Sequence, residues 1–168
     1  IHKEKIVCDI TSGYFDKTLG DIKISKGFYL DKKNRNKNIK RNYTYKDIVL
    51  SGNNLVKKPF SHVNIDLSGI AKGYAVDLVY NYLLSKNISN FVINVGGEIK
   101  TYSRYEDAIA IAIDDPTNNQ QYIEEVLLNN NSIATSGTYI DTVNFEGLEI
   151  SHITNPKTLQ NVSNLNIL

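Results

Sequence analysis

The segment Asp66-Leu-Ser-Gly-Ile-Ala-Lys-Gly73 has residue types and spacing that could hold a phosphate, and it leads into a predicted helix over residues 73–86. The first N–H groups of a helix are unpaired and carry a partial positive charge, which favours anions. Lys72 adds a full positive charge, and Asp66 could accept a hydrogen bond from a ribose or a base. An ordinary turn, whose glycines only ease packing, explains the same residues about as well.

Three other segments place polar groups next to glycines or turns. Asn94-Val-Gly-Gly-Glu98 follows a predicted strand, and its glycines either let a planar ligand approach the backbone or form a tight turn. The clustered hydroxyls of Ala134-Thr-Ser-Gly-Thr-Tyr139 could line a polar pocket or form a turn. His152 is a lone histidine, which is more often structural than catalytic. The residues alone do not decide whether each segment is a ligand-binding or catalytic site or only a structural element.

Composition and charge exclude several classes of protein. The 168 residues fit one domain, and the net charge of +1 provides no field that would favour nucleic acid. A single cysteine, Cys8, rules out a disulfide framework, and no cysteine–histidine cluster of zinc type is present. We expect Cys8 to be a small buried side chain. The basic run from Asp31 to Lys46, which includes Arg41, is expected to be a solvated loop or hairpin tip.

The hydrophobic pattern predicts many short strands and one strong helix. Short strands are expected between residues 43 and 66, with a hairpin turn at Ser51–Asn54 and a last strand at Val63–Ile65. The helix over residues 73–86 is apolar around most of its circumference, which predicts a mostly buried helix. Its clearest apolar stripe consists of Tyr74, Leu78 and Tyr82. Many strands with one strong helix indicate an α+β fold.

Taken together and in this order, these segments resemble the signature of the ApbE family of flavin transferases. The family pattern is a Gly-x-Phe-Asp turn, then Asp-Leu-Gly/Ser-Gly-Ile-Ala-Lys-Gly-Tyr-Ala, Asn-x-Gly-Gly-Asp/Glu, Ala-Thr-Ser-Gly-x-Tyr and His-Ile-x-Asp-Pro-x-Thr. The matching segments are residues 13–16, 66–75, 94–98, 134–139 and 152–158. The second pattern is highly specific, and its four companions leave little room for coincidence.

The resemblance implies an α+β, sheet-built domain with FAD in a cleft. The positions that contact FAD in the family correspond here to Tyr14, Phe15, Asp16, Asp66, Lys72 and Thr154. Gly69 corresponds to the position whose main-chain carbonyl is a magnesium ligand, and a hard cation does prefer oxygen. His152 corresponds to the histidine proposed in the family as the base that acts on the acceptor hydroxyl.

The activity that the resemblance implies is Mg²⁺-dependent transfer of FMN from FAD, the substrate, to a threonine hydroxyl of an acceptor flavoprotein, with release of AMP. The acceptor is expected to carry a Ser/Asp-Gly-Ala-Ser/Thr-Thr motif. Two alternatives keep the same pocket: an FAD-binding module without turnover, and a hydrolase that splits FAD into FMN and AMP because water replaces the threonine. A plain structural domain is a third alternative, and the five ordered segments argue against it.

The chain departs from the family pattern in three respects. Asn155 replaces the usual Asp, and Leu159 replaces the usual Gly. The remaining magnesium ligands of the family, an Asp-x-x-x-Thr pair, do not appear before Leu168. We therefore expect a single flavin-transferase domain over residues 1–168 that lacks the N- and C-terminal parts of the full family domain. The resemblance also implies a lipoprotein outside the cytoplasmic membrane, attached through an anchor absent from this chain, with no nucleic-acid partner.

Overall fold

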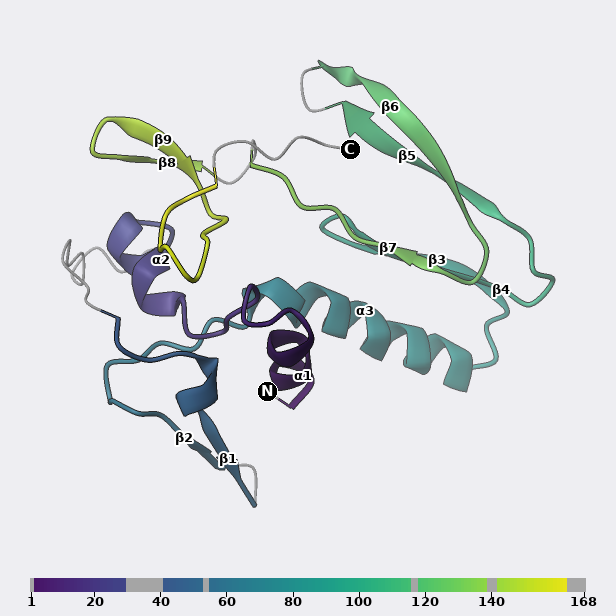
Figure 1. The fold of residues 1–168 in the computed structure, drawn as a ribbon. Coiled ribbons are helices and arrows are strands. Elements are labelled where there is room, and N and C mark those ends of the chain that lie inside the picture. Colours follow the sequence, from purple (N-terminus) through teal and green to yellow (C-terminus); the bar gives the residue numbers. More distant parts are fainter. Residues whose placement is uncertain (1, 30–40, 53–54, 116–117, 139–141, 163–168) are drawn as a thin grey trace. The chain divides into compact units, whose positions relative to one another are not determined.

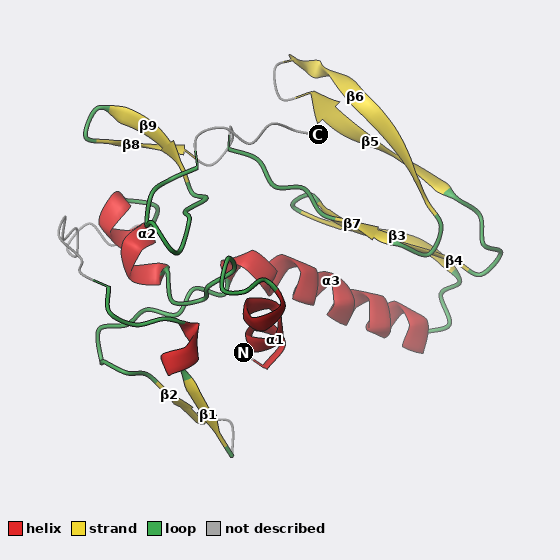
Figure 2. Ribbon diagram, viewed as in Figure 1, coloured by secondary structure: helices red, strands yellow, loops and turns green. Residues whose placement is uncertain are grey.

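The computed structural model describes residues 2–29, 41–52, 55–115, 118–138 and 142–162. The chain divides into two compact units, one made of Ile1–Leu67 with Gly137–Leu168 and the other of Ser68–Ser136. Each unit combines helix with antiparallel strands (Figures 1 and 2), which confirms the α+β class. Within the described residues, none of the helices combines the length and apolarity needed to cross a membrane.

Unit 1, as we call Ile1–Leu67 with Gly137–Leu168, contains short elements joined by longer connections. Its helices are α1 (His2–Ile10), α2 (Gly20–Lys26) and a 3-10 turn, η2 (Tyr45–Asp47). Its strands form two antiparallel hairpins, β1 (Val49–Ser51) with β2 (Leu55–Lys57), and β8 (Thr142–Phe145) with β9 (Leu148–Ser151). The first hairpin confirms the expected pairing across residues 51–54, although Asn53 and Asn54 lie outside the described residues.

The core of unit 1 is small and has a polar centre. Tyr43, Ile48 and Val63 form its buried hydrophobic cluster. Beside them, Asp21 accepts hydrogen bonds from the Tyr43 hydroxyl at 2.5 Å and from the Asn64 side-chain amide at 2.5 Å. Burial, followed by the hydrogen bond to Asp21, raises the pKa of Tyr43. The phenol is therefore neutral at physiological pH and serves as a donor to the carboxylate.

The expectation of a strand at Val63–Ile65 is wrong, because this segment is irregular backbone. The N–H of Asn64 donates to the Asp21 carboxylate at 3.2 Å. The N–H of Asp66 donates to the Lys17 carbonyl at 2.7 Å. The N–H of Asn64 is thus used by α2, and the N–H of Asp66 by the loop before α2, instead of by a neighbouring strand.

Unit 2, Ser68–Ser136, is built from one long helix and two antiparallel β structures. Helix α3 (Ser68–Ser85) is followed by β3 (Asn90–Val95) and β4 (Glu98–Ser103), and β7 (Ser132–Ile133) adds a short strand beside β4. β5 (Ile109–Asp115) and β6 (Asn118–Leu128) form a separate hairpin. The predicted helix is confirmed, but it begins at Ser68, so most of the phosphate-like segment lies inside its first turns.

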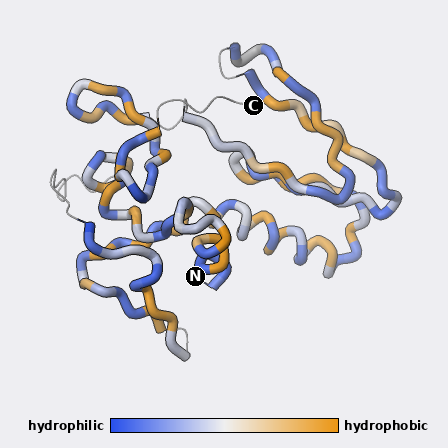
Figure 3. Tube along the Cα trace, in the orientation of Figure 1, coloured by the Kyte–Doolittle hydropathy of each residue, from blue (hydrophilic) through white to orange (hydrophobic). Residues whose placement is uncertain are grey.

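The expectation that α3 is mostly buried is wrong. The stripe expected in the core is between 52% and 61% exposed and consists of Tyr74, Leu78 and Tyr82. Apolar residues recur along the whole helix (Figure 3), so the pattern cannot identify the face that packs. The sheet covers a different face, where Val76 is buried and the Tyr80 ring meets Phe91 and Tyr102 at centroid distances of 5.6 and 5.9 Å.

Candidate functional site

Asp16, which the sequence places in the expected flavin turn, is a buried hub of unit 1. Its Oδ1 accepts hydrogen bonds from the N–H of Thr18 at 2.9 Å and from the Thr18 hydroxyl at 2.6 Å. Its Oδ2 accepts from Arg41 Nη2 and, at 3.3 Å, from the N–H of Tyr45. The Asp16 side chain is 3% exposed. Both carboxylate oxygens of Asp16 therefore have hydrogen-bond partners within the protein.

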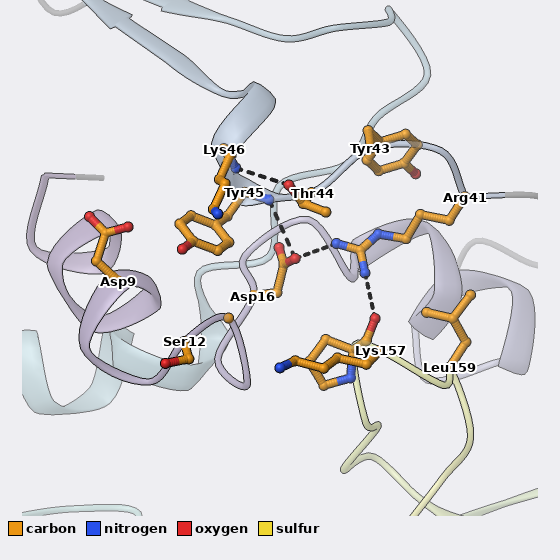
Figure 4. Close-up of a pocket in the computed structure, with 12 residues that line it drawn as sticks. Asp9, Ser12, Asp16, Arg41, Tyr43, Thr44, Tyr45, Lys46, Lys157 and Leu159 are labelled. Carbon is orange, nitrogen blue, oxygen red and sulfur yellow. Dashed lines mark hydrogen bonds and ion pairs between the residues drawn. The ribbon is translucent and has the colours of Figure 1, made fainter.

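The expectation of a solvated basic loop is wrong for Arg41, and residues 31–40 of that run lie outside the described residues. The Arg41 side chain is 4% exposed and ion-paired with Asp16. Its Nη2 also donates to the Thr18 hydroxyl at 2.6 Å, and its Nη1 donates to the Pro156 carbonyl at 2.9 Å (Figure 4). A buried cation needs a partner of opposite charge, and Asp16 provides it.

Residues 152–161 form a compact loop after β9. His152 is half-buried at its start, and Thr154 is buried and pairs with Asn161 as an isolated antiparallel bridge. Asn155 Oδ1 accepts from the main-chain N–H groups two and three residues later, at 2.9 and 3.3 Å. A carboxylate oxygen could accept the same two bonds. Asn155 therefore keeps a turn that the Asp of the family pattern would also stabilise.

Leu159, which stands where the family pattern has glycine, adopts a left-handed backbone with φ +60°. Such a conformation costs an L side chain about 1–2 kcal/mol, and glycine avoids this cost. Replacement by glycine or by alanine removes nearly the same apolar contacts, but only glycine relieves the strain. We expect Leu159→Gly to be more stable than Leu159→Ala by about 1 kcal/mol in urea unfolding. Equal stability of the two variants would show that the backbone is not strained here.

A hollow of about 690 Å³ opens beside the buried ion pair (Figure 4). Charged and aromatic residues contribute to its lining, among them Asp9, Tyr43, Tyr45, Lys46 and Lys157. Tyr14 is 62% exposed, and Lys157 Nζ lies 4.1 Å from its ring centroid. Phe15 is half-buried, and its N–H donates to the Thr11 hydroxyl at 3.1 Å. An exposed ring with a cation over one of its faces suits a planar, anionic ligand.

Asp66, expected to hold FAD, is anchored to α2. Its Oδ2 lies 2.5 Å from Lys23 Nζ, and the two side chains are 8% and 15% exposed. Its main-chain N–H is also bonded, as described above, to the Lys17 carbonyl. The structure thus fixes Asp66 from both its side chain and its backbone, two residues before α3 begins.

Lys72, in unit 2, joins two of the predicted segments. Its Nζ donates to the Gly96 carbonyl at 3.0 Å and lies 2.7 Å from Glu98 Oε2. Gly96 and Gly97 have φ of +58° and +94°, as a two-residue hairpin turn between β3 and β4 requires. The tight-turn interpretation of this glycine pair is therefore correct. The same turn brings residues 94–98 next to the start of α3.

Gly69 lies in the first turn of α3, where a main-chain carbonyl points along the helix and accepts an intrahelical hydrogen bond. Among the residues that the structure describes, no group of three or more His, Cys, Asp and Glu side chains could hold a metal ion. Mg²⁺ prefers several oxygen ligands, commonly with one or two carboxylates among them. The described residues therefore do not fit a magnesium site by themselves.

Comparison with known proteins identifies the family of this chain. The model of the ApbE family matches residues 1–167. The chain belongs to the ApbE family. A relative from Vibrio cholerae serotype O1, named FAD:protein FMN transferase, is 36% identical over 120 residues, which are 70% of this chain and 36% of the relative. A relative of the same name from Buchnera aphidicola subsp. Schizaphis graminum is 32% identical over 160 residues, 88% of this chain and 47% of the relative.

Solved structures of ApbE proteins share the fold. The crystal structure of the ApbE protein from Thermotoga maritima has a TM-score of 0.79 and 26% identity, over 94% of this chain and 54% of that one. The flavin transferase ApbE from Vibrio cholerae has a TM-score of 0.70 and 27% identity, over 97% of this chain and 54% of that one. The chain thus spans about half the length of these structures and less than half of the two curated relatives.

Proposed function

We propose that this ApbE-family protein transfers FMN from FAD to a threonine hydroxyl of an acceptor flavoprotein and releases AMP. The observation that carries the proposal is the family match over residues 1–167, with relatives at 32% and 36% identity that are named FAD:protein FMN transferase. The acceptor is proposed to carry a Ser/Asp-Gly-Ala-Ser/Thr-Thr motif. This motif rests on the family resemblance.

The chain's own residues account for binding and for proton transfer. Tyr14 offers an exposed aromatic face to the flavin. In unit 2, Lys72 lies in the second turn of α3 and is ion-paired with Glu98, and the family resemblance assigns it a role in holding FAD. His152 takes the proton of the acceptor threonine while the threonine oxygen attacks the FMN-side phosphorus. A P–O bond forms to the threonine, the bridging P–O bond breaks, and AMP leaves with the bridging oxygen.

Magnesium dependence is part of the proposal and rests on the family resemblance. The resemblance assigns one oxygen to the ion, the Gly69 carbonyl, and the described residues contain no group of three or more His, Cys, Asp and Glu side chains that could hold a metal ion. No catalytic step is therefore assigned to the ion. EDTA should abolish transfer by the protein produced from its complete gene, and added Mg²⁺ should restore it. Full transfer in EDTA would remove the metal from the proposal.

The balance of products separates transfer from hydrolysis. The protein, FAD, Mg²⁺ and an acceptor with the stated motif are mixed, and AMP and free FMN are measured by chromatography. Transfer predicts AMP without an equivalent of free FMN, because the flavin remains on the acceptor. AMP and free FMN in equal amounts would replace transfer by hydrolysis. If FAD is bound but not consumed, the remaining alternative is an FAD-binding module without turnover.

A substitution at Gly73, in the second turn of α3, tests whether this glycine allows FAD to approach the backbone or only eases packing. In the described structure nothing lies within 4 Å of the position that a Cβ would take there. Alanine is favoured over glycine inside a helix by about 0.5–1 kcal/mol, so Gly73→Ala should raise the free energy of unfolding. If FAD approaches this backbone, the same variant should bind FAD more weakly.

Gly52→Ala is the matched control for Gly73→Ala, because Gly52 also lies in open space but outside the five family segments. It should leave FAD affinity unchanged. FAD affinity is measured by flavin fluorescence and stability by urea unfolding. Unchanged FAD affinity in Gly73→Ala would contradict a close approach of FAD at this glycine.

We further propose that the protein acts outside the cytoplasmic membrane, held there through an anchor, as the family resemblance implies. Cell fractionation followed by protease treatment of intact cells or spheroplasts tests the location. A protein protected from protease until the cells are lysed, and recovered in the soluble cytoplasmic fraction, would contradict it.

A further inference from the structure

Two cationic side chains tie the loop 152–161 to the rest of unit 1. Arg41 Nη1 donates to the Pro156 carbonyl at 2.9 Å. Lys26, at the end of α2, donates from Nζ to the Leu159 carbonyl at 2.7 Å and to Asn161 Oδ1 at 2.6 Å. The loop is thus held at the main-chain carbonyls of Pro156 and Leu159 and at the side chain of Asn161.

Arg41 also connects this loop to the expected flavin turn. The same guanidinium that holds Pro156 through Nη1 binds Asp16 through Nη2 and the Thr18 hydroxyl at 2.6 Å. A guanidinium is planar, and its N–H groups diverge in fixed directions. One rigid group therefore sets the separation between the main chain at Pro156 and the turn that carries Tyr14.

We propose that Arg41 is a positioning residue of the transfer site, which fixes the loop carrying His152 and Thr154 relative to the Tyr14–Asp16 turn. This inference rests on the proposed function. His152 belongs to the same short loop as Pro156, and the bridge between Thr154 and Asn161 makes that loop compact. A displacement at Pro156 is therefore transmitted to the proposed base.

The expected effect is on turnover more than on binding. A displacement of a reacting group by about 1 Å can cost about 100-fold in rate, because proton transfer requires hydrogen-bond distance. FAD affinity is spread over many contacts, so it changes less. A merely structural role of Arg41 predicts the opposite outcome, a loss of stability with the turnover of the folded protein unchanged.

Arg41→Lys tests the inference in the protein produced from its complete gene. Lysine keeps a positive charge for Asp16 but cannot donate in the two fixed directions that reach Asp16 and Pro156 together. With FAD, Mg²⁺ and the acceptor, we expect kcat for transfer to fall by about 10–100-fold, while the Kd for FAD changes little. The folded fraction of each variant is measured by circular dichroism and urea unfolding.

Thr18→Val is the matched control. It removes an acceptor of the same guanidinium from a fully buried position and leaves the bond to the Pro156 carbonyl in place. This variant should lose stability and keep the kcat of the wild type. If Thr18→Val lowers kcat as much as Arg41→Lys does, the loss does not depend on the bond between Arg41 and Pro156, and the inference is overturned.

Lys26→Met gives a second, independent test, because it removes the other cationic tie without touching the buried pair. It should also lower kcat, and it decides the matter if Arg41→Lys does not fold. If Arg41→Lys folds and keeps the kcat of the wild type, the inference is overturned and the proposed function stands. If Arg41→Lys does not fold, a wild-type kcat in Lys26→Met has the same consequence. A wild-type protein without transfer overturns the proposed function, and the inference with it.

Discussion

Replacement of His152 by alanine should slow FMN transfer by about 10²–10⁴-fold, the range that a general base contributes. The variant loses the group proposed to accept the threonine proton. It keeps the exposed ring of Tyr14 and the charge of Lys72, which are the proposed contacts to FAD on other segments. The Kd for FAD should therefore remain close to that of the wild type. Labelling of the acceptor is followed by in-gel flavin fluorescence, and FAD binding by fluorescence titration.

His62 offers the matched control for this experiment. It is exposed, it lies outside the five family segments in the sequence, and its ring stacks on Phe60 with the centroids 5.4 Å apart. His62→Ala should transfer FMN at the wild-type rate. A wild-type rate in His152→Ala would remove His152 from the mechanism, and an equal loss in His62→Ala would make the effect of His152→Ala non-specific.

Asp16→Ala should lower the free energy of unfolding by about 3–5 kcal/mol, because it leaves the guanidinium of Arg41 buried without its counter-charge. The side chains of the pair are only 3% and 4% exposed, so water does little to screen the remaining charge. The loss also frees the N–H groups of Thr18 and Tyr45 from their acceptor. The midpoint and slope of urea unfolding measure the change.

Two companion variants separate charge burial from the loss of hydrogen bonds. Asp47→Ala removes an exposed carboxylate that accepts the N–H of Thr44 at 2.8 Å, and it should cost only about 1 kcal/mol. Asp16→Ala combined with Arg41→Leu removes both buried charges, and it should be more stable than Asp16→Ala alone. An Asp16→Ala variant as stable as Asp47→Ala would contradict the account of the buried pair.

The secondary structure was predictable where the hydrophobic pattern is local. The packing of the elements against one another was not predictable. The apolar spacing after Asp66 identifies α3, because helix formation depends on residues three and four apart. The same spacing cannot tell which face of α3 meets the sheet, since apolar side chains occur on several faces. Val76 and Tyr80 pack, whereas the more regular stripe through Leu78 stays exposed.

The candidate site was also predictable only in part. The five ordered segments are linear motifs, and they lead from the sequence to the family. The partners of those segments are distant in sequence: Arg41 lies 25 residues after Asp16, and Lys26 lies 135 residues before Asn161. Neither cation stands in a motif, and Arg41 occurs in a run of lysines and asparagines that resembles a solvated loop. Only the folded chain identifies them.

Covalent flavin on the acceptor threonine is the most direct measure of the proposed activity. The acceptor is incubated with FAD, Mg²⁺ and the protein produced from its complete gene, denatured, and examined by in-gel fluorescence and intact mass. The proposed activity predicts a fluorescent acceptor whose mass has increased by one FMN phosphoester, and no label on an acceptor whose motif threonine is replaced by alanine. An unlabelled acceptor in a reaction that consumes FAD, or equal labelling of the alanine variant, would contradict it.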